Sequence, residues 1–298
     1  MLLSLWTSFR RAAWNAFLHN AFTTAKAAAY SAILSLFPAL LTGTTLLALS
    51  PETETLSDMR SAFYDFLPPD TMGLVQNYFQ MNHARSIRLI WSATGVAIFA
   101  ATGFMLSLME GFRRAYRLPH GTWNFWRERV VAFGLIPITL VPMLFATMLI
   151  VFGHQFERWM IENADHGLRL YVLLIWRMVR WVIAMLTSVA VLAVIYHFGT
   201  PKTQDWRKVL PGALLATATW FFATLLYGLY VTRFADYSIV YGSLGAAVAT
   251  LVWLYMVSIS ILIGAEFNAQ IFPVHGSRPA SETDDEENAF TKGKRQTA

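Results

Sequence analysis

Long apolar stretches separated by short polar segments dominate the hydrophobic pattern of this chain. A membrane-spanning helix needs about 20 mostly apolar residues, and a lipid-buried segment must satisfy its own backbone hydrogen bonds. Windows of suitable length lie near residues 27–49, 87–109, 130–152, 175–198, 209–231 and 239–265. They lack the alternation with period two that marks a membrane β-barrel. The pattern predicts an all-α polytopic membrane protein built as a bundle of six transmembrane helices.

Residues 1–26 have a different pattern. The basic pair Arg10–Arg11 lies in the middle of this segment rather than ahead of a long apolar core, which argues against a signal peptide. Apolar side chains recur beside that pair at helical spacing, namely Leu2, Leu5, Phe9, Ala13 and Phe17. This arrangement is typical of an amphipathic helix that lies on a membrane surface. We therefore expect residues 1–26 to form a cytoplasmic N-terminal arm.

The segment between the first two windows, residues 50–86, is long but patterned. Two short helical repeats flank Pro68–Pro69, where the missing N–H groups end a helix. We expect short interfacial helices there, on the outer face of the bundle. After Pro273 the chain becomes polar and is predicted to be disordered. The predicted organisation is an arm at 1–26, a six-helix domain at 27–272 and a cytoplasmic tail at 273–298.

The distribution of charge orients the predicted bundle. Lys and Arg collect in the arm, in residues 110–129 and in residues 200–208, whereas acids outnumber bases in residues 50–86 and 153–170. Cytoplasmic loops carry the excess of Lys and Arg. Both termini are therefore predicted to be cytoplasmic. This outcome needs an even number of spans, which agrees with six.

Composition agrees with a membrane protein. The chain is 56% hydrophobic and 14% charged, against about 25% charged residues in soluble domains. The sequence pI is about 9.5, but in a membrane protein excess Lys and Arg fixes topology, so no nucleic-acid partner is expected. The chain has no cysteine, which excludes disulfides and thiolate chemistry.

Arg177 and Arg180 are unusual because they fall at the start of an apolar window. Three residues apart, they share one helix face. If the span begins near Tyr171, both lie in the apolar region and could bind an anion such as a lipid phosphate. If the span begins later, both extend to the headgroup layer, which the flanking Trp176 and Trp181 favour. The sequence leaves open whether they face a cavity, lipid or the interface.

Polar residues also mark the predicted inner boundary. Glu110 can pair with Arg113 or Arg114, one turn further along the same helix. Glu266 and Asn268 follow the last apolar window.

Two interpretations of Glu266 and Asn268 stay open. Both side chains could bond an inner-side neighbour, such as Lys26 or the backbone around the first span. Alternatively, they could serve as a gate or a substrate contact.

Motifs for catalysis are missing from the sequence. The seven histidines are scattered and none forms an HExxH pair. GxSxG and GxxxxGK[ST] are absent as well. We therefore expect no enzyme activity, no cofactor and no metal.

Small residues recur at four-residue spacing inside the windows, as in Gly212/Ala216, Gly242/Ala246 and Gly245/Ala249. Such faces let membrane helices approach closely. The predicted packing motif comprises Tyr241, Gly242, Gly245 and Gly264.

Several of these motifs together resemble a known family. The first window contains AAAYSAILSLFPALL, and the last third contains Tyr241–Gly245 (YGSLG), Trp253–Tyr255 (WLY) and Gly264–Glu266 (GAE) with Asn268. This combination is similar to that of the YihY/BrkB family of bacterial inner-membrane proteins, over about residues 20–272.

The resemblance implies a six-helix protein of the cell envelope. The family is associated with serum resistance and with envelope lipid homeostasis, and lipid transport has been proposed for it. Some members are labelled ribonuclease BN, but a metal-dependent nuclease needs clustered His and Asp ligands, which this sequence lacks. The leading hypothesis is a flippase-like transporter of a lipid or other amphiphile, with membrane lipids as partners. The alternative is a scaffold that holds envelope-biogenesis proteins together without transport.

Overall fold

The structure is a computed structural model of the whole chain. It describes residues 2–49, 83–119, 121, 123–163, 169–202, 204–233 and 243–273. The interfacial helices predicted within 50–86 lie almost wholly outside these ranges. Tyr241, Gly242 and the tail after Pro273 also lie outside them.

The described part of the chain is helical and contains no strand. Its helices are α1 (Leu2–Leu18), α2 (Ala21–Leu49), α5 (His83–Ala115), α6 (Phe125–Asn163), α7 (Arg169–Phe198), α8 (Trp206–Arg233) and α10 (Ser243–Ile271). All but α1 contain a stretch long and apolar enough to cross a membrane. The predicted all-α fold with six spans is confirmed, although most helices extend beyond their apolar windows. Within the described residues the last span covers Gly245–Ile271; residues 239–242 of its predicted window lie outside them.

The outer surface of the spans is strongly apolar. Large side chains such as Phe99 and Trp91 are 83% and 74% exposed. A soluble protein rarely exposes such side chains over a continuous surface. Lipid tails are the solvent that this surface fits.

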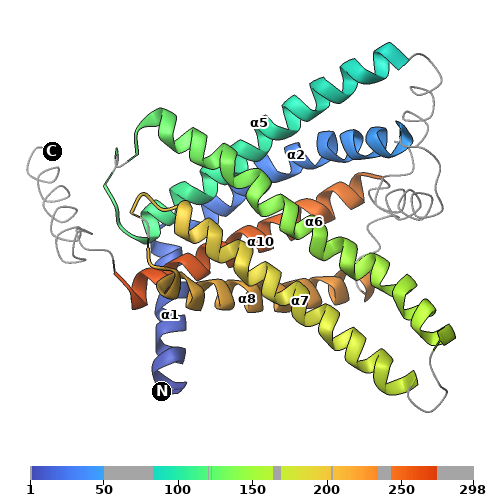
Figure 1. Cartoon of the computed structure of the whole chain (residues 1–298). Helices are drawn as coiled ribbons and strands as arrows, with labels where there is room; N and C mark the ends of the chain where they lie inside the picture. The colour runs from blue at the N-terminus through green and yellow to red at the C-terminus, as the bar shows by residue number, and fades with distance from the viewer. Residues whose placement is uncertain are drawn as a thin grey trace, which may run out of the picture.

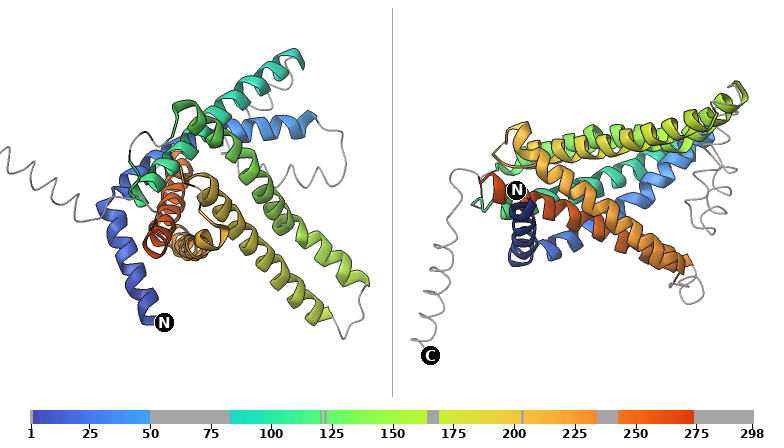
Figure 2. Two further views of the ribbon diagram at one scale, coloured as in Figure 1. Left: turned by 60° about the vertical axis from the view of Figure 1, so that its left-hand side comes forward. Right: turned by 90° about the horizontal axis from the view of Figure 1, so that it is seen from below.

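The helices form pairs that meet at one end of the molecule. The main contacts join α2 to α5, α8 to α10 and α6 to α7, and α10 also packs on α2. Figure 1 shows these pairs close together on the left and spreading apart toward the right, and both views of Figure 2 agree. We call the left-hand part the convergent end; its residues are 21–32, 104–119, 188–202, 204–217 and 258–272, with the start of α6. The remaining parts of the spans form the divergent half.

Burial follows the same division. On α2, α8 and α10, every apolar side chain described as buried lies in the convergent end. The convergent end also contains Phe112 of α5 and Tyr196 of α7, whose rings meet edge to face with centroids 5.3 Å apart. In the divergent half most described side chains are half-buried or exposed. The closely packed core is therefore confined to the convergent end.

Two turns at the convergent end depend on left-handed residues. Asn20, with φ of 58°, joins α1 to α2; its carbonyl accepts hydrogen bonds from the backbone N–H and the hydroxyl of Thr24. Asparagine tolerates this conformation better than most residues. Arg117, with φ of 51°, ends α5. There the N–H of Leu118 reaches the carbonyl of Arg113, as in a Schellman motif.

The turn at Asn20 redirects the chain. Helix α1 lies across the convergent end instead of continuing along α2 (Figure 1), and it packs mainly on α10. Pro38, Pro137 and Pro142 lie within α2 and α6, which continue through them.

Candidate functional site at the convergent end

A buried acid–histidine pair connects the two ends of the described chain. Glu266, on the last turns of α10, is 2% exposed. Its Oε1 lies 2.8 Å from Nδ1 of His19, which sits in the turn after α1. Glu266 bonds a neighbour at its own end of the bundle, but that neighbour is His19 and not the suggested Lys26. The membrane side on which this end lies stays a prediction. Lys26 lies on the exposed side of α2, whereas the fold of α1 across α10 brings His19 to the carboxylate.

Asn268 joins α10 to α8. Its side chain is fully buried. The amide oxygen accepts a hydrogen bond from the N–H of Gly212 at 2.6 Å, and the amide nitrogen donates to the carbonyl of Val209 at 2.9 Å. The bonding partner is therefore the fifth span and not the first, which corrects the second part of the prediction. Because both the oxygen and the nitrogen of this buried amide have hydrogen-bond partners, these bonds offset the cost of removing the amide from water.

Two glycines allow this approach of α8 and α10. A Cβ on Gly264 would collide with the Tyr196 hydroxyl, the Gly212 carbonyl and Ala216; a Cβ on Gly212 would collide with the Gly264 carbonyl and Asn268. The hydroxyl of Tyr196 donates to the carbonyl of Ile261 at 2.7 Å. The small-residue packing predicted for Gly264 is thus observed, and Gly245 is also buried.

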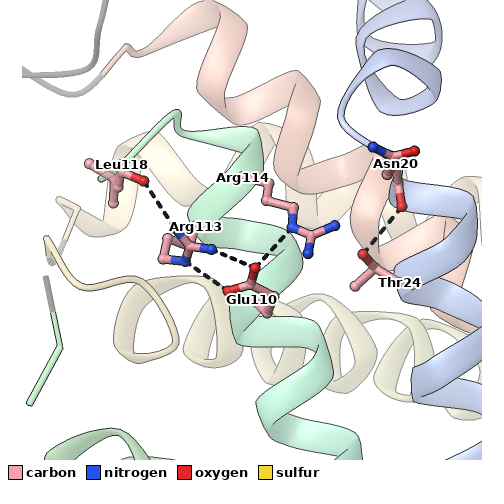
Figure 3. A network of polar contacts seen from close by, with 6 residues as sticks. All are labelled: Asn20, Thr24, Glu110, Arg113, Arg114 and Leu118. Atoms are coloured by element: carbon pink, nitrogen blue, oxygen red, sulfur yellow. Dashed lines mark hydrogen bonds and ion pairs between the residues drawn. The ribbon is translucent and has the colours of Figure 1, made fainter. Parts of the chain in front are cut away.

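Glu110 forms a second ionic cluster at the end of α5 (Figure 3). Its carboxylate accepts hydrogen bonds from Arg113 Nε at 2.7 Å and from Arg114 Nε at 2.9 Å. Arg113, which is 7% exposed, also donates to the carbonyl of Leu118 at 3.3 Å. The predicted pairing is confirmed with both arginines. Because the cluster closes on the Schellman turn, it stabilises the end of α5.

Tyr116 lies just beyond α5 and is 3% exposed. Burial, and then the negative charge of Glu266, raise the pKa of the Tyr116 hydroxyl well above its usual range. The Glu266 carboxylate therefore lies close enough to the end of α5 to act electrostatically on Tyr116.

A shallow cavity of about 720 Å³ opens beside this core. It is lined by His197, Gln204, Asp205, Trp206, Arg207, Lys208 and Phe272. The ring of His197 stacks on Trp206 at 4.1 Å, and its Nδ1 lies 2.5 Å from the carbonyl of Gln204. Lys208 pairs with Asp205 at 2.7 Å. The pair neutralises one of the two cations, so the lining is only weakly positive.

Arg177 and Arg180 lie far from these clusters, on the part of α7 in the divergent half. They continue, at helical spacing, the stripe of buried residues Ala184, Ser188, Val191 and Ile195. Trp181, one turn beyond Arg177, contacts Phe221 of α8 with ring centroids 6.2 Å apart. The arginines are therefore on the side of α7 that faces the other helices. Arg177 is exposed and Arg180 half-buried.

At the convergent end the Glu266 and Glu110 carboxylates are paired with other side chains of the protein. The buried Glu266 carboxylate has His19 as its partner, and the half-buried Glu110 carboxylate has Arg113 and Arg114. The described residues contain no group of three His, Asp or Glu able to hold a metal ion. Sequence reasoning missed His19, Tyr196 and Asn20. The sequence offered one signal for His19, namely its own position as a polar residue beside the apolar stripe of the arm.

These features define a multi-pass membrane protein with a bundle of six helices. The chain belongs to the virulence factor BrkB family, which it matches over residues 14–288. This finding agrees with the resemblance seen in the sequence.

Several relatives match over most of the chain. The ribonuclease-like protein YfkH of Bacillus subtilis is 29% identical over 253 residues, which cover 85% of this chain and 90% of the relative. A UPF0761 membrane protein of Psychromonas ingrahamii is 24% identical, with coverage of 82% and 80%. Another, from Stenotrophomonas maltophilia, is 25% identical over 89% of this chain but only 61% of its own length. No solved structure matches the chain.

Proposed function

We propose that this protein moves an anionic lipid or similar amphiphile between the leaflets of the bacterial inner membrane. The observation that carries this proposal is the uneven packing of the bundle. Its buried apolar side chains collect at the convergent end, and the helix pairs separate in the divergent half. Interiors normally pack closely throughout. A loosely packed half gives an amphiphile room to enter between helices.

The inward-facing arginines supply a binding chemistry. Arg177 and Arg180 continue the buried stripe of α7 in this loosely packed half. A guanidinium presents a planar fork of donors that fits phosphate in two places. A charged residue inside a membrane bundle is costly and is normally functional. A lipid phosphate is the ligand class that these two side chains fit best.

Transport with access from one side needs a bundle that is closed at its other end, and the convergent end provides this closed part. His19–Glu266, Asn268 with α8, and the Gly212–Gly264 approach join α1, α8 and α10 there. With both termini in the cytoplasm, this closed end lies on the inner side and the divergent half faces outward. Reporter fusions at the two termini test that orientation. No enzymatic step, cofactor or nucleic acid takes part in this account.

Reconstitution in liposomes tests the proposal. Purified protein should accelerate movement of a fluorescent phosphatidylglycerol across the bilayer. Each charge-assisted contact is worth about 1.5–3 kcal/mol, so the Arg177→Gln/Arg180→Gln variant should move this lipid at least about tenfold more slowly. The lysine variant, which keeps the charge, should retain part of the rate.

A matched control separates this effect from a loss of total charge. Arg207→Gln/Lys208→Gln removes two cations from the opposite end and should leave the rate unchanged. A folded wild-type protein that moves no lipid, and retains none in native mass spectrometry, would contradict transport. Recovery of a stoichiometric protein partner in mild detergent would then favour the scaffold.

A further inference from the structure

Helix α1 has two faces with different surroundings. Ala12 and Ala16 are fully buried, on the side where α1 packs against α10. The opposite face carries Trp14, Phe17 and Leu18, which are 64%, 63% and 57% exposed. Because exposed apolar patches of this size mark interaction sites, we expect another molecule or surface to cover this face of α1.

The exposed rings form a strip that continues into the first span. Trp14 and Phe17 stack with centroids 6.1 Å apart, and Phe17 meets Phe22 of α2 at 6.2 Å. Further along α2 the exposed side contains Tyr30, Leu34 and Phe37, which a membrane span must present to lipid. Because the strip on α1 is continuous with a lipid-facing surface, the membrane itself is the occupant that fits it.

Charge indicates which membrane surface. Arg10 and Arg11 are exposed on α1, on either side of Trp14 around the helix. Residues 1–49 contain no Asp or Glu, and Lys26 adds a third cation on the exposed side of α2. Basic residues near a bilayer are attracted by anionic headgroups, and tryptophan favours the headgroup level.

We propose that the Trp14–Phe17–Leu18 face of α1, with Arg10 and Arg11, docks on the acidic phospholipid surface at the convergent end of the bundle. The helix lies in the plane of that surface, with its rings among the acyl carbons next to the headgroups. Its other face holds α10 through Ala12, Ala16 and the His19–Glu266 pair. Docking therefore fixes the helix that supplies the partner of Glu266. This inference does not depend on whether the protein transports lipid.

Spin labelling tests the docking, because the chain has no native cysteine. Full-length Phe17→Cys protein is labelled and placed in nanodiscs of phosphatidylcholine alone or mixed with phosphatidylglycerol. In the mixed discs the label should collide with oxygen and be protected from a water-soluble nickel chelate. In phosphatidylcholine alone, collisions with nickel should increase. Leu18→Cys, on the same face, provides an independent label site if the Phe17 substitution disturbs folding.

The arginines provide the decisive variant. Arg10→Gln/Arg11→Gln should remove the difference between the two lipid compositions, while Arg207→Gln/Lys208→Gln, which removes the same charge elsewhere at this end, should preserve it. Three results would overturn the proposal. They are free collision with nickel in both lipids, protection from oxygen and nickel alike, and a lipid dependence that survives loss of Arg10 and Arg11. The second result would mean that protein, such as another copy of the chain, covers the face.

Discussion

The convergent end and the divergent half are built from the same helices but are held together differently. At the convergent end, helices approach through glycines and are joined by buried polar bonds. In the divergent half the side chains are less buried. The bonds between helices there are partly buried, such as the 3.3 Å contact between the Thr42 and Thr94 hydroxyls and the 2.9 Å bond from the Tyr227 hydroxyl to the Ala249 carbonyl. A bundle with one rigid end and one loose end can change its opening without losing its fold.

Paired glycine substitutions should show the largest difference between the two regions. Gly264→Ala places a methyl group against the Tyr196 hydroxyl and the backbone of α8, and overpacking of this kind costs about 1–3 kcal/mol or more. Gly95→Ala, in the divergent half, meets no atom within 4 Å and should stabilise its helix by about 0.5–1 kcal/mol. Thermal unfolding in detergent measures both changes. Equal effects at the two positions would contradict the comparison.

The buried amide of Asn268 should have the next largest effect. Asn268→Leu leaves the Gly212 N–H and the Val209 carbonyl without this side-chain partner, and an unsatisfied buried group costs about 1–3 kcal/mol. Thr42→Val is the comparison change in the divergent half: it removes the 3.3 Å bond to the Thr94 hydroxyl and a 2.9 Å bond to the Pro38 carbonyl within α2. We expect it to cost less than Asn268→Leu, about 1 kcal/mol, because this site is only partly buried. Denaturant unfolding by circular dichroism compares the two variants. A larger loss of unfolding free energy for Thr42→Val would mean that the stronger contacts lie in the divergent half, which would contradict the comparison.

Glu266→Gln removes the negative charge while keeping a side chain that can hydrogen-bond to His19. We expect a loss of about 1–2 kcal/mol, the difference between a charge-assisted and a neutral hydrogen bond in a buried site. The effect should appear in folding and expression rather than in the pH dependence of function. A double-mutant cycle with His19→Gln isolates the pair. A Glu266→Gln protein that folds normally but loses function would indicate a gate or a substrate contact.

Tyr116 should produce the smallest effect, and only at alkaline pH. Burial and the charge of Glu266 raise the pKa of its hydroxyl in the folded protein. A raised pKa favours the neutral form, so this contribution to stability is complete below about pH 10, where an exposed tyrosine ionises, and is lost as pH rises further. Melting curves between neutral and alkaline pH should therefore fall less steeply for Tyr116→Phe. If the melting temperature of Tyr116→Phe falls with alkaline pH as steeply as that of the native protein, Tyr116 does not contribute to this pH dependence.

The fold was predictable because lipid permits few solutions. A segment such as 209–231 is long, apolar and without period-two alternation, so a spanning helix is the only structure that satisfies its backbone. Local spacing also predicted that Glu110 pairs with Arg113 and Arg114, since residues three and four apart share a helix face. Both inferences require only neighbours along the chain.

The partners of Glu266 and Asn268 could not be predicted in the same way. Their bonds join residues 247 and 56 positions apart. The bond of Glu266 depends on α1 folding across α10 at Asn20, and those of Asn268 depend on the close approach of α8 and α10. A single sequence gives no signal for the turn at Asn20 beyond an asparagine between two helical patterns. The position of Arg177 depended similarly on the phase of α7 relative to its buried stripe, which the sequence alone left open.

The reactivity of single cysteines along α7 tests the central claim most directly. Arg177→Cys and Met178→Cys are both at exposed positions, but the first continues the inward stripe and the second points away from it. Ile195→Cys, 5% exposed at that position in the native protein, reports on the convergent end. A maleimide that cannot cross the membrane is applied to sealed vesicles in which the protein is inserted in one orientation or the other. Our account predicts fast labelling of Arg177→Cys from one side only, little labelling of Met178→Cys in lipid, and none of Ile195→Cys from either side. Labelling of Arg177→Cys no faster than Met178→Cys, or labelling of Ile195→Cys, would contradict a bundle that is open at one end and closed at the other.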